Sequence, residues 1–174
     1  MGLNYRDHAA ESRSEIPTVP TIFNKFPNVV IAPGDPIVLP KVSRKPDYEA
    51  EFAFVIGKGG RNIPAERAME HVIGYTIIND VTSRDWQNRH LQWHMGKSFD
   101  TFCPMGPWLV SADTCDGTHT QVRCYVNGEE RQNASTTDLI FDIPTLIETL
   151  SAGITLYPGD LIFTGTPEGV GPVV

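Results

Sequence analysis

Two glutamates at the start of one apolar run place the tightest constraint on how this chain can fold. Glu49 and Glu51 lie within residues 46–57 and point to the same face of a strand, with Ala53 and Val55 after them, because side chains alternate between faces. The opposite face carries Tyr48, Ala50, Phe52, Phe54 and Ile56. A strand that is apolar on both faces is usually buried on both faces. This run therefore predicts an interior strand that begins with two carboxylates.

Two neighbouring carboxylates cannot lie in a dry interior as bare anions. Burying charge costs free energy unless a metal, a proton or cationic partners compensate it. A divalent cation would compensate both glutamates at once. The spacing alone leaves a second interpretation open, in which Glu49 and Glu51 form an exposed strand face and pair with Lys or Arg. The apolar continuation of the same face favours the buried pocket.

Asp80 is the third candidate ligand. Residues 74–80 predict another strand, and Asp80 ends it immediately before the polar residues 82–85. A carboxylate at a strand end faces the rim of a pocket, where it would join Glu49 and Glu51 in an all-oxygen site. Such ligands suit Mg²⁺, Mn²⁺ or Ca²⁺ better than zinc. Three carboxylates leave coordination positions for water and substrate, as a catalytic metal requires.

His8 and Glu11 form a second candidate group. They are spaced i, i+3, so on a helical turn they share one side and can hydrogen-bond. A glutamate can orient an imidazole and raise its basicity, which produces a general base for water. On spacing alone, a solvated His–Glu pair is the simpler interpretation. Lys97, between Gly96 and Ser98, could bind an anion, although a solvated side chain is the default for a lysine.

Composition bounds the class of protein. The 174 residues suffice for one domain, and 40% hydrophobic with 20% charged residues is an ordinary globular balance. A net charge of −7 without a basic patch argues against nucleic acid or an anionic membrane as a partner. No apolar run is long enough for a spanning helix, and the polar N-terminus does not resemble a signal peptide. Three cysteines without a C-x-x-C pair indicate a reduced, cytoplasmic setting.

Turn and periodicity signals predict mostly strands. Besides the two strands above, short strands are expected at residues 37–39, 107–111, 121–126, 154–156 and 160–164. The strand at 121–126 runs into Asn127-Gly128, a strong hairpin signal. Helices are expected at residues 64–72 and from the capping residue Asp142 to Gly153, and residues 81–94 are helix or loop. The predicted fold class is mostly β with small helices (α+β), as a rolled-up sheet or partial barrel.

Five strings occur in the order that one family shows. They are residues 2–11 (Gly-Leu-Asn-Tyr-Arg-Asp-His-Ala-Ala-Glu), 47–51 (Asp-Tyr-Glu-Ala-Glu), 78–85 (Ile-Asn-Asp-Val-Thr-Ser-Arg-Asp), 96–100 (Gly-Lys-Ser-Phe-Asp), and 158–160 with 164–167 (Pro-Gly-Asp and Thr-Gly-Thr-Pro). On these strings the chain resembles the catalytic, C-terminal domain of the fumarylacetoacetate hydrolase family, in its bacterial acylpyruvate or fumarylpyruvate hydrolase-like branch. The resemblance covers nearly the whole sequence.

The resemblance implies a mixed β roll that forms a homodimer and uses magnesium or manganese, with calcium as a possibility. One catalytic domain over residues 1–174 is expected, in which residues 1–30 form a lid-like segment with the His–Glu pair and residues 31–174 form the β-roll core. The first string begins at residue 2 and the sequence given stops at Val174. The resemblance therefore implies truncation at both ends, with the closing strands absent.

Residue by residue, the resemblance also implies roles in a site. The implied metal ligands are Glu49, Glu51 and Asp80. The implied catalytic residues are His8 and Glu11, which activate water, and Lys97, which stabilises negative charge. The implied substrate-binding residues are Arg84, Gln87 and Thr166.

The implied reaction is hydrolysis of the C–C bond of a 2,4-dioxo acid, an acylpyruvate such as fumarylpyruvate or acetylpyruvate, to pyruvate and a carboxylic acid. One alternative keeps the metal site and changes the chemistry to oxaloacetate decarboxylation, or to enol–keto isomerisation or hydration in aromatic degradation. An alternative of another class is an inactive metal-binding fragment.

Overall fold

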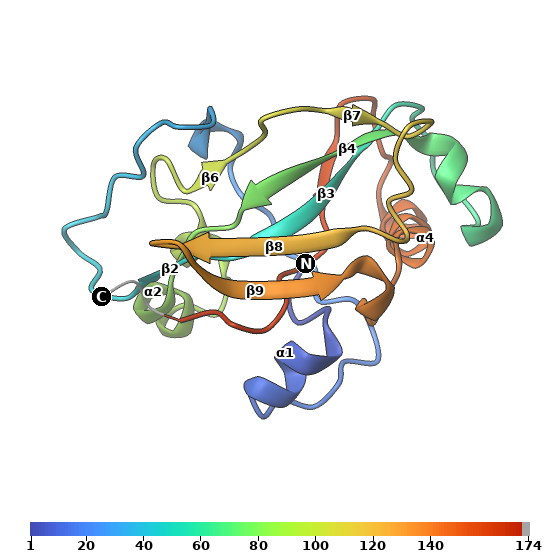
Figure 1. The fold of residues 1–174 in the computed structure, drawn as a ribbon. Helices are drawn as coiled ribbons and strands as arrows, with labels where there is room; N and C mark the ends of the chain where they lie inside the picture. The colour runs from blue at the N-terminus through green and yellow to red at the C-terminus, as the bar shows by residue number, and fades with distance from the viewer. Residues whose placement is uncertain (172–174) are drawn as a thin grey trace.

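The computed structural model describes residues 1–171, and its centre is an antiparallel sheet with the strand order β10-β3-β4-β7 (Figure 1). These strands are Leu161–Phe163 (β10), Ala50–Ile56 (β3), Val72–Asn79 (β4) and Val110–Ser111 (β7). β3 is the interior strand that the sequence predicts, and all of its residues except Val55 are buried. It has β10 on one side and β4 on the other.

The other strands form two-stranded sheets. β8 (Gln121–Val126) and β9 (Glu129–Ser135) make an antiparallel hairpin, and β8 packs against β3. β1 (Val30–Ile31) pairs in parallel with β6 (Cys103–Pro104), and β2 (Pro46–Asp47) pairs antiparallel with β5 (Thr82–Ser83). The hairpin prediction is confirmed: Asn127 and Gly128 have φ of 53° and 84°, the positive values that a tight hairpin turn requires.

The helical elements are short. They are α1 (Arg6–Glu11), α2 (Arg84–Arg89), α3 (His94–Lys97) and α4 (Ile143–Gly153), with 3₁₀ turns η1 (Pro27–Val29), η2 (Ala65–His71) and η3 (Thr136–Asp138). The predicted cap of α4 is confirmed, because Asp142 Oδ1 accepts the Thr145 N–H at 2.9 Å. None of the described helices is long and apolar enough to cross a membrane. The predicted class, mostly β with small helices, is the observed class.

One predicted strand is absent. Residues 37–39 have no strand structure. Pro36 and Pro40 flank these residues, and proline lacks the N–H that a sheet ladder needs. The N–H of Val38 instead donates to Thr101 Oγ1 at 2.8 Å.

Three further elements differ from the prediction. Residues 154–156 contribute only an isolated bridge between Leu156 and Gly60. Residues 64–72 form the 3₁₀ turn η2 after Pro64 instead of an α-helix. The strand over 46–57 is interrupted before β3, because the N–H of Glu49 donates to the side chain of Asn79 and not to a backbone carbonyl.

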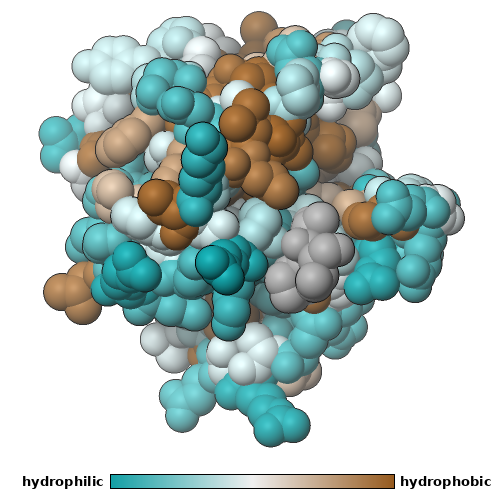
Figure 2. Space-filling view, turned by 90° about the vertical axis from the view of Figure 1, so that its left-hand side faces the viewer, coloured by the Kyte–Doolittle hydropathy of each residue, from teal (hydrophilic) through white to brown (hydrophobic). Residues whose placement is uncertain are grey.

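The surface is polar over most of the face in Figure 2. The same view, which shows the side at the left of Figure 1, also shows apolar side chains gathered in one patch. Contiguous exposed apolar surface commonly marks an interaction site.

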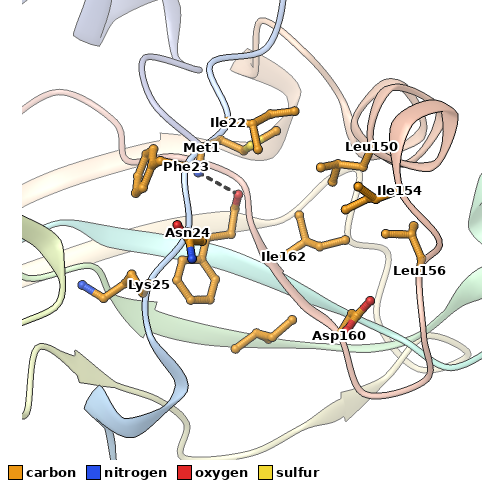
Figure 3. A pocket seen from close by; sticks show the side chains of 12 residues that line it. Met1, Ile22, Phe23, Asn24, Lys25, Leu150, Ile154, Leu156, Asp160 and Ile162 are labelled. Carbon is orange, nitrogen blue, oxygen red and sulfur yellow. Dashed lines mark hydrogen bonds between the residues drawn. The ribbon is translucent and has the colours of Figure 1, made fainter. Parts of the chain in front are cut away.

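Residues 22–25 run beside β10 and line a cavity of about 350 Å³ (Figure 3). Its apolar lining includes Ile22, Phe23, Leu150, Ile154, Leu156 and Ile162. The Met1 ammonium donates to the carbonyl of Phe163 at 3.2 Å, and Lys25 points its nitrogen away from the cavity. The cavity is lined by none of the three predicted metal ligands, so it is not the candidate active site.

Asn4 ties the N-terminal segment to distant parts of the chain. Its Nδ2 donates to the carbonyl oxygens of Phe141 at 3.0 Å and Thr164 at 2.8 Å, and its Oδ1 accepts the N–H of Phe141 at 2.8 Å. Asn4 is buried, so these bonds satisfy a polar group that would otherwise be costly to remove from water. They fix the chain immediately before α1.

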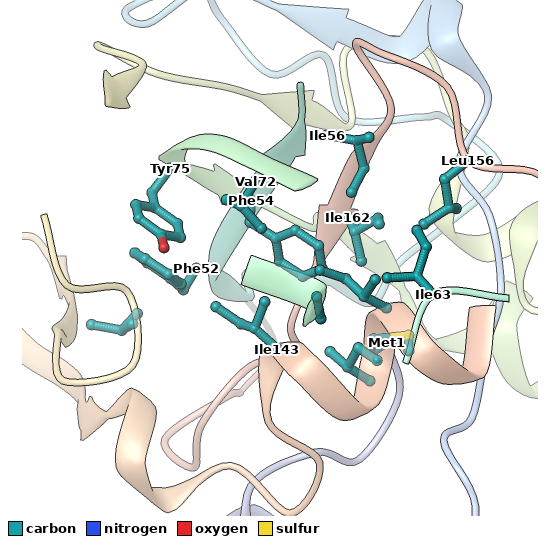
Figure 4. Packing of buried hydrophobic residues seen from close by; sticks show 14 of the residues in the cluster. Met1, Phe52, Phe54, Ile56, Ile63, Val72, Tyr75, Ile143, Leu156 and Ile162 are labelled. Atoms are coloured by element: carbon teal, nitrogen blue, oxygen red, sulfur yellow. The ribbon is translucent and has the colours of Figure 1, made fainter. Parts of the chain in front are cut away.

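The main core lies between β3 and α4 (Figure 4). Its members include Phe52, Phe54 and Ile56 from β3 and Ile143, Leu146 and Ile147 from α4. Phe52 stacks on Tyr75 of β4 with ring centroids 5.2 Å apart. On the other face of β3, Ala53 packs in a second cluster with Val29, Ile78 and Cys103. Packing on both faces holds β3 rigidly, so groups at its start have a firm support.

Candidate functional site

The three predicted metal ligands converge where β3 begins and β4 ends. Ala50 pairs with Asn79, so Glu49 lies beside Asp80. The N–H of Asp80 donates to the carbonyl of Glu49 at 2.8 Å. One carboxylate oxygen from each of Glu49, Glu51 and Asp80 lies within 4.8 Å of the others, and all three residues are buried. The exposed strand face that the spacing left open is therefore not what the structure shows.

Two buried lysines bind Asp80. Lys97 Nζ donates to Asp80 Oδ2 at 2.8 Å and to Glu49 Oε2 at 2.5 Å. Lys25 Nζ donates to Asp80 Oδ1 at 2.7 Å, to the carbonyl of Val81 at 3.2 Å and to the carbonyl of Lys97. Burial alone would raise the pKa of Asp80, but the two ammonium groups hold this pKa below its ordinary value. Asp80 is therefore ionised.

Arg84 completes the set of cations. Its Nη1 donates to Glu49 Oε1 and its Nε to Asp47 Oδ2, each at 2.7 Å. Nη1 also reaches Gln87 Oε1 at 3.1 Å. Burial opposes the charge of Arg84, but the two carboxylates raise the pKa of the guanidinium. Because Arg84 binds both carboxylates, it helps to orient Glu49.

Glu51 differs from Glu49 and Asp80 because it has no cationic side chain bonded to it. Its Oε2 accepts the N–H of Gly165 at 2.6 Å, whereas its Oε1 is buried without a hydrogen-bond partner among the described residues. Burial, together with the nearby carboxylates of Asp80 and Glu49, raises the pKa of Glu51 to about 8. A hard cation bound between Glu51 and the two neighbouring carboxylates would supply the partner that Glu51 Oε1 lacks.

The charge balance also fits a divalent metal. Four carboxylates (Asp47, Glu49, Glu51 and Asp80) face three cationic side chains (Lys25, Arg84 and Lys97), so these side chains carry one negative charge in excess when Glu51 is ionised and none while its raised pKa keeps it protonated. We call these seven residues the acidic centre. A divalent ion would change the balance to one positive charge, which attracts a carboxylate substrate. The residues present therefore fit the metal that the donor set implies.

A cavity of about 400 Å³ opens beside the acidic centre. Its lining includes six of the predicted site residues: His8, Glu49, Arg84, Gln87, Lys97 and Thr166. Glu11, Glu51 and Asp80 do not line it. The structure thus brings the predicted metal ligands, the histidine and the predicted substrate-binding residues to one place.

The His8–Glu11 pair reaches this cavity from α1. His8 Nδ1 lies 3.3 Å from Glu11 Oε2, and the side chains are 14% and 42% exposed. Both Glu11 oxygens also accept the N–H of Gly169, at 3.1 and 3.2 Å. Gly169 has a φ of 91°, and an added Cβ would lie 1.8 Å from the carbonyl oxygen of Arg131, so only glycine fits. Among the described residues, this bond ties Glu11 of the dyad to the loop after β10.

Gln87 and Thr166 differ in what they can offer a substrate. Gln87 Oε1 accepts a hydrogen bond from Arg84, so the amide nitrogen of Gln87 is the group that could donate to a substrate. Thr166 Oγ1 donates to the carbonyl of Ala50 at 2.9 Å and accepts from Gln132 Nε2 at 2.8 Å. Because its proton is already donated, the Thr166 hydroxyl can accept a hydrogen bond from a substrate but cannot donate one.

The sequence did not single out Lys25 or Asp47. Two aromatic residues near Lys25, Phe23 and Phe26, are the signal in the sequence that its side chain could be buried. Asp47 lies in the same string as Glu49, and its Oδ1 accepts the N–H of Gly171 at 3.0 Å. Lys25 bonds directly to the predicted ligand Asp80, whereas Asp47 acts on Glu49 through Arg84, which binds both carboxylates.

Comparisons with known proteins agree with this geometry. Residues 1–173 match the family described as Fumarylacetoacetate (FAA) hydrolase C-terminal. The chain is 52% identical over 175 residues to an oxaloacetate tautomerase of Bacillus subtilis (strain 168), covering 98% of this chain and 58% of that protein. It is 49% identical over 174 residues to a mitochondrial oxaloacetate tautomerase of Xenopus laevis, covering 98% and 54%.

A solved structure carries a metal. The fumarylpyruvate hydrolase from Pseudomonas aeruginosa in complex with Mn²⁺ and pyruvate has a TM-score of 0.91 and 39% identity, covering 99% of this chain and 78% of that one. The chain spans little more than half the length of the two tautomerases. The Mn²⁺ in that structure and the carboxylate cluster here together point to a divalent metal.

Proposed function

Because the chain belongs to the fumarylacetoacetate (FAA) hydrolase family, whose members are enzymes, we propose that it is a divalent-metal-dependent hydrolase of a 2,4-dioxo acid. The substrate would be an acylpyruvate, and the products pyruvate and a carboxylic acid. One observation carries the proposal: His8, paired with Glu11, lines the same cavity as Glu49 and Lys97. A base and an anion-stabilising cation thus face one space.

Glu49, Glu51 and Asp80 would hold the metal, with Mg²⁺ or Mn²⁺ as the ions that this donor set suits. The ion, when bound, would act as a Lewis acid on the carboxylate and 2-oxo oxygens of the substrate. Lys97 and Arg84 neutralise the remaining charge of Glu49, which keeps the site attractive to an anionic substrate.

The chain's own residues then supply the proton transfers. His8 takes a proton from water, Glu11 stabilises the imidazolium, and the hydroxide adds to the 4-oxo carbon. The bond between C3 and C4 breaks, and its electron pair passes to C3 as the enolate of pyruvate. Lys97 has three N–H groups, of which Glu49 and Asp80 take two. The third would stabilise the enolate oxygen, and the His8 imidazolium returns to C3 the proton that it took from water, which completes the reaction.

Keto–enol tautomerisation of oxaloacetate is the second candidate, and the names of the two relatives at 49% and 52% identity favour it. This reaction moves a proton between C3 and the 2-oxo oxygen and needs no water. The same His8 and Lys97 would serve as base and acid. Hydrolysis differs from tautomerisation because it also needs a water beside His8 and a substrate with a ketone at C4, which oxaloacetate lacks.

The experiment measures both reactions on one preparation. Pyruvate release from acetylpyruvate and fumarylpyruvate, and decay of enol-oxaloacetate absorbance, would be followed with Mg²⁺ or Mn²⁺ and then with EDTA. Pyruvate release that EDTA abolishes is the expected result. Tautomerisation without release would replace the hydrolase by the second candidate, and carbon dioxide from oxaloacetate would indicate a decarboxylase. Folded protein that is inactive in all assays would contradict both proposals.

We also propose that the protein acts as a homodimer. β7 pairs only with β4 among the described strands, and Trp108 and Leu109 just before it are 72% and 57% exposed. An exposed strand edge flanked by apolar side chains is suited to pairing with a second copy. Light scattering should give the dimer mass, and Trp108→Lys should give monomers. The cytoplasmic location stays a prediction, and one relative is named as mitochondrial.

A further inference from the structure

Gln132 belongs to β9 of the hairpin, an element that supplies none of the predicted site residues. Its side chain is buried, with an exposed fraction of 1%. Its Oε1 accepts the N–H of Ala50 at 3.0 Å, and its Nε2 donates to Thr166 Oγ1 at 2.8 Å and to the carbonyl of Pro167 at 2.9 Å. Every hydrogen atom and the oxygen of this amide are thus engaged.

The bond to Ala50 falls where β3 has lost its neighbouring strand. β10 pairs with β3 from Leu161↔Val55 to Phe163↔Ala53, and Thr164 continues the register by donating to the carbonyl of Phe52. Two positions further, this register would set Thr166 opposite Ala50. Gly165 has a φ of 97°, which turns the backbone away there.

Side chains replace the missing strand at Ala50. The Thr166 hydroxyl donates to the Ala50 carbonyl at 2.9 Å, while Gln132 takes the Ala50 N–H. Ala50 lies between the two glutamates of the acidic centre. Its backbone therefore sets the direction in which Glu49 and Glu51 leave the strand, and Gln132 is one of its two supports on this side.

We propose that Gln132 is a positioning residue for the metal and for the substrate. It holds Ala50, and through Ala50 the two glutamates, while it holds Thr166 against the cavity. This inference rests on one part of the proposed function, the metal site, and does not depend on which reaction the protein catalyses. Outer partners of metal ligands commonly change metal affinity by about 10- to 100-fold when they are lost.

Gln132→Met tests the proposal, because methionine keeps the length and approximate volume but breaks all three hydrogen bonds. Asn133→Ala is the matched control: Asn133 is the next residue and is exposed, and among the described residues its side chain bonds only to Gln121 and Glu130 of the same hairpin. Calorimetric titration with Mn²⁺ alone, on protein with equal folded fraction by circular dichroism, should show affinity weakened about 10- to 100-fold in Gln132→Met. The control should bind Mn²⁺ like the wild type.

A second variant guards against misfolding. Gln132→Asn keeps the amide group but shortens the side chain by one methylene group, so the amide no longer reaches its partners. This variant changes the polarity of the side chain less than Gln132→Met does, and its affinity for Mn²⁺ should also fall. With active protein, KM should rise more than kcat falls, since Thr166 faces the substrate cavity. Unchanged Mn²⁺ affinity in folded Gln132→Met or Gln132→Asn would overturn the proposal.

The two proposals can fail separately. A wild type that binds Mn²⁺ but cleaves no 2,4-dioxo acid contradicts the proposed reaction, while the Gln132 variants still give a result on metal affinity. A wild type that binds no divalent metal overturns the inference about Gln132 together with the metal site.

Discussion

The acidic centre and the dyad on α1 meet at one cavity but are built in opposite ways. Glu51 and Asp80 are fully buried at the ends of two packed strands, and Asp80 has two ammonium partners. His8 and Glu11 lie on a six-residue helix and are partly exposed, and Glu11 contacts the rest of the site through one glycine N–H. The difference separates a buried candidate metal site from a proposed base on a short helix with partly exposed side chains. Changes in the centre should therefore alter binding and stability, and changes in the dyad should alter turnover.

The largest expected effect is on metal binding. Glu51→Gln keeps the shape of the side chain but prevents it from becoming a carboxylate, and the Oε1 of Glu51 has no hydrogen-bond partner among residues 1–171. Metal affinity should fall by more than the roughly 100-fold that loss of an outer partner can cause. Calorimetric titration with Mn²⁺ measures this, with Glu70→Gln on the exposed surface as the control. Wild-type affinity in Glu51→Gln would exclude Glu51 as a ligand.

His8→Ala should change turnover and leave binding alone. Loss of a general base commonly slows a reaction by about 10²- to 10⁴-fold, while the metal ligands lie on other elements. Steady-state kinetics and a Mn²⁺ titration on the same protein test both statements. His119→Ala serves as the control, because His119 is exposed and does not line the cavity. Full activity in His8→Ala would remove His8 from the mechanism.

Lys25→Met should lower stability more than it lowers turnover. Removing one partner of a buried ion pair costs about 3–5 kcal/mol, because the other charge stays buried, and both Lys25 and Asp80 are almost fully buried. Chemical denaturation of the metal-free protein gives the free energy of unfolding. The exposed Lys45→Met is the matched control. A loss as small as that of Lys45→Met would mean that Lys97 alone compensates Asp80.

The free energy of unfolding should depend on pH through Glu51 of the acidic centre. The pKa of Glu51 in the folded protein is raised from 4.5 to about 8. The folded state thus holds this proton more tightly, so its stabilising contribution is complete below pH 4.5 and is lost as the pH rises to about 8.

Metal affinity should show the opposite trend to this stability, because the ligand must lose its proton. It should rise with pH up to about 8, by at most about tenfold per pH unit. Titrations in buffers of different ionisation enthalpy would report the released proton. An affinity that does not change over this range would contradict the raised pKa.

Glu11→Gln should give the smallest effect. A half-exposed carboxylate pair is worth about 0.2–1 kcal/mol, so turnover should fall about fivefold or less. Glutamine still offers an oxygen to the N–H of Gly169, whose bond to Glu11 holds α1. Steady-state kinetics of Glu11→Gln and His8→Ala, measured side by side, compare the two losses in turnover. A loss as large as that of His8→Ala would show that the charge of Glu11, and not its hydrogen bond, sustains the base.

Local patterns predicted much of the fold. The apolar faces of residues 50–56 predicted β3, Asn127-Gly128 predicted the hairpin, and Asp142 predicted the cap of α4. Each is decided by neighbours in the sequence. The strand predictions for residues 37–39 and 154–156 were wrong, because a strand needs a partner strand and the position of that partner is set by tertiary structure.

The acidic centre shows the same limit. Glu49 and Glu51 could be placed on one face from their spacing, but the two cations on Asp80 could not be predicted. Lys25 is 55 residues from Asp80 in the sequence, and a single lysine is normally solvated. The role of Gln132 was equally hidden, because its pattern in β9 is that of any polar strand residue.

Asn4 has a consequence for how the chain folds. Its partners Phe141 and Thr164 lie 137 and 160 positions along the chain, and contacts of such separation slow folding because a long loop must close first. During synthesis, β3, β4 and the β8–β9 hairpin can assemble while α1 has no place to dock. The cavity beside His8 can form only after residue 164 has left the ribosome. The candidate site should therefore form after the central strands and the β8–β9 hairpin have assembled.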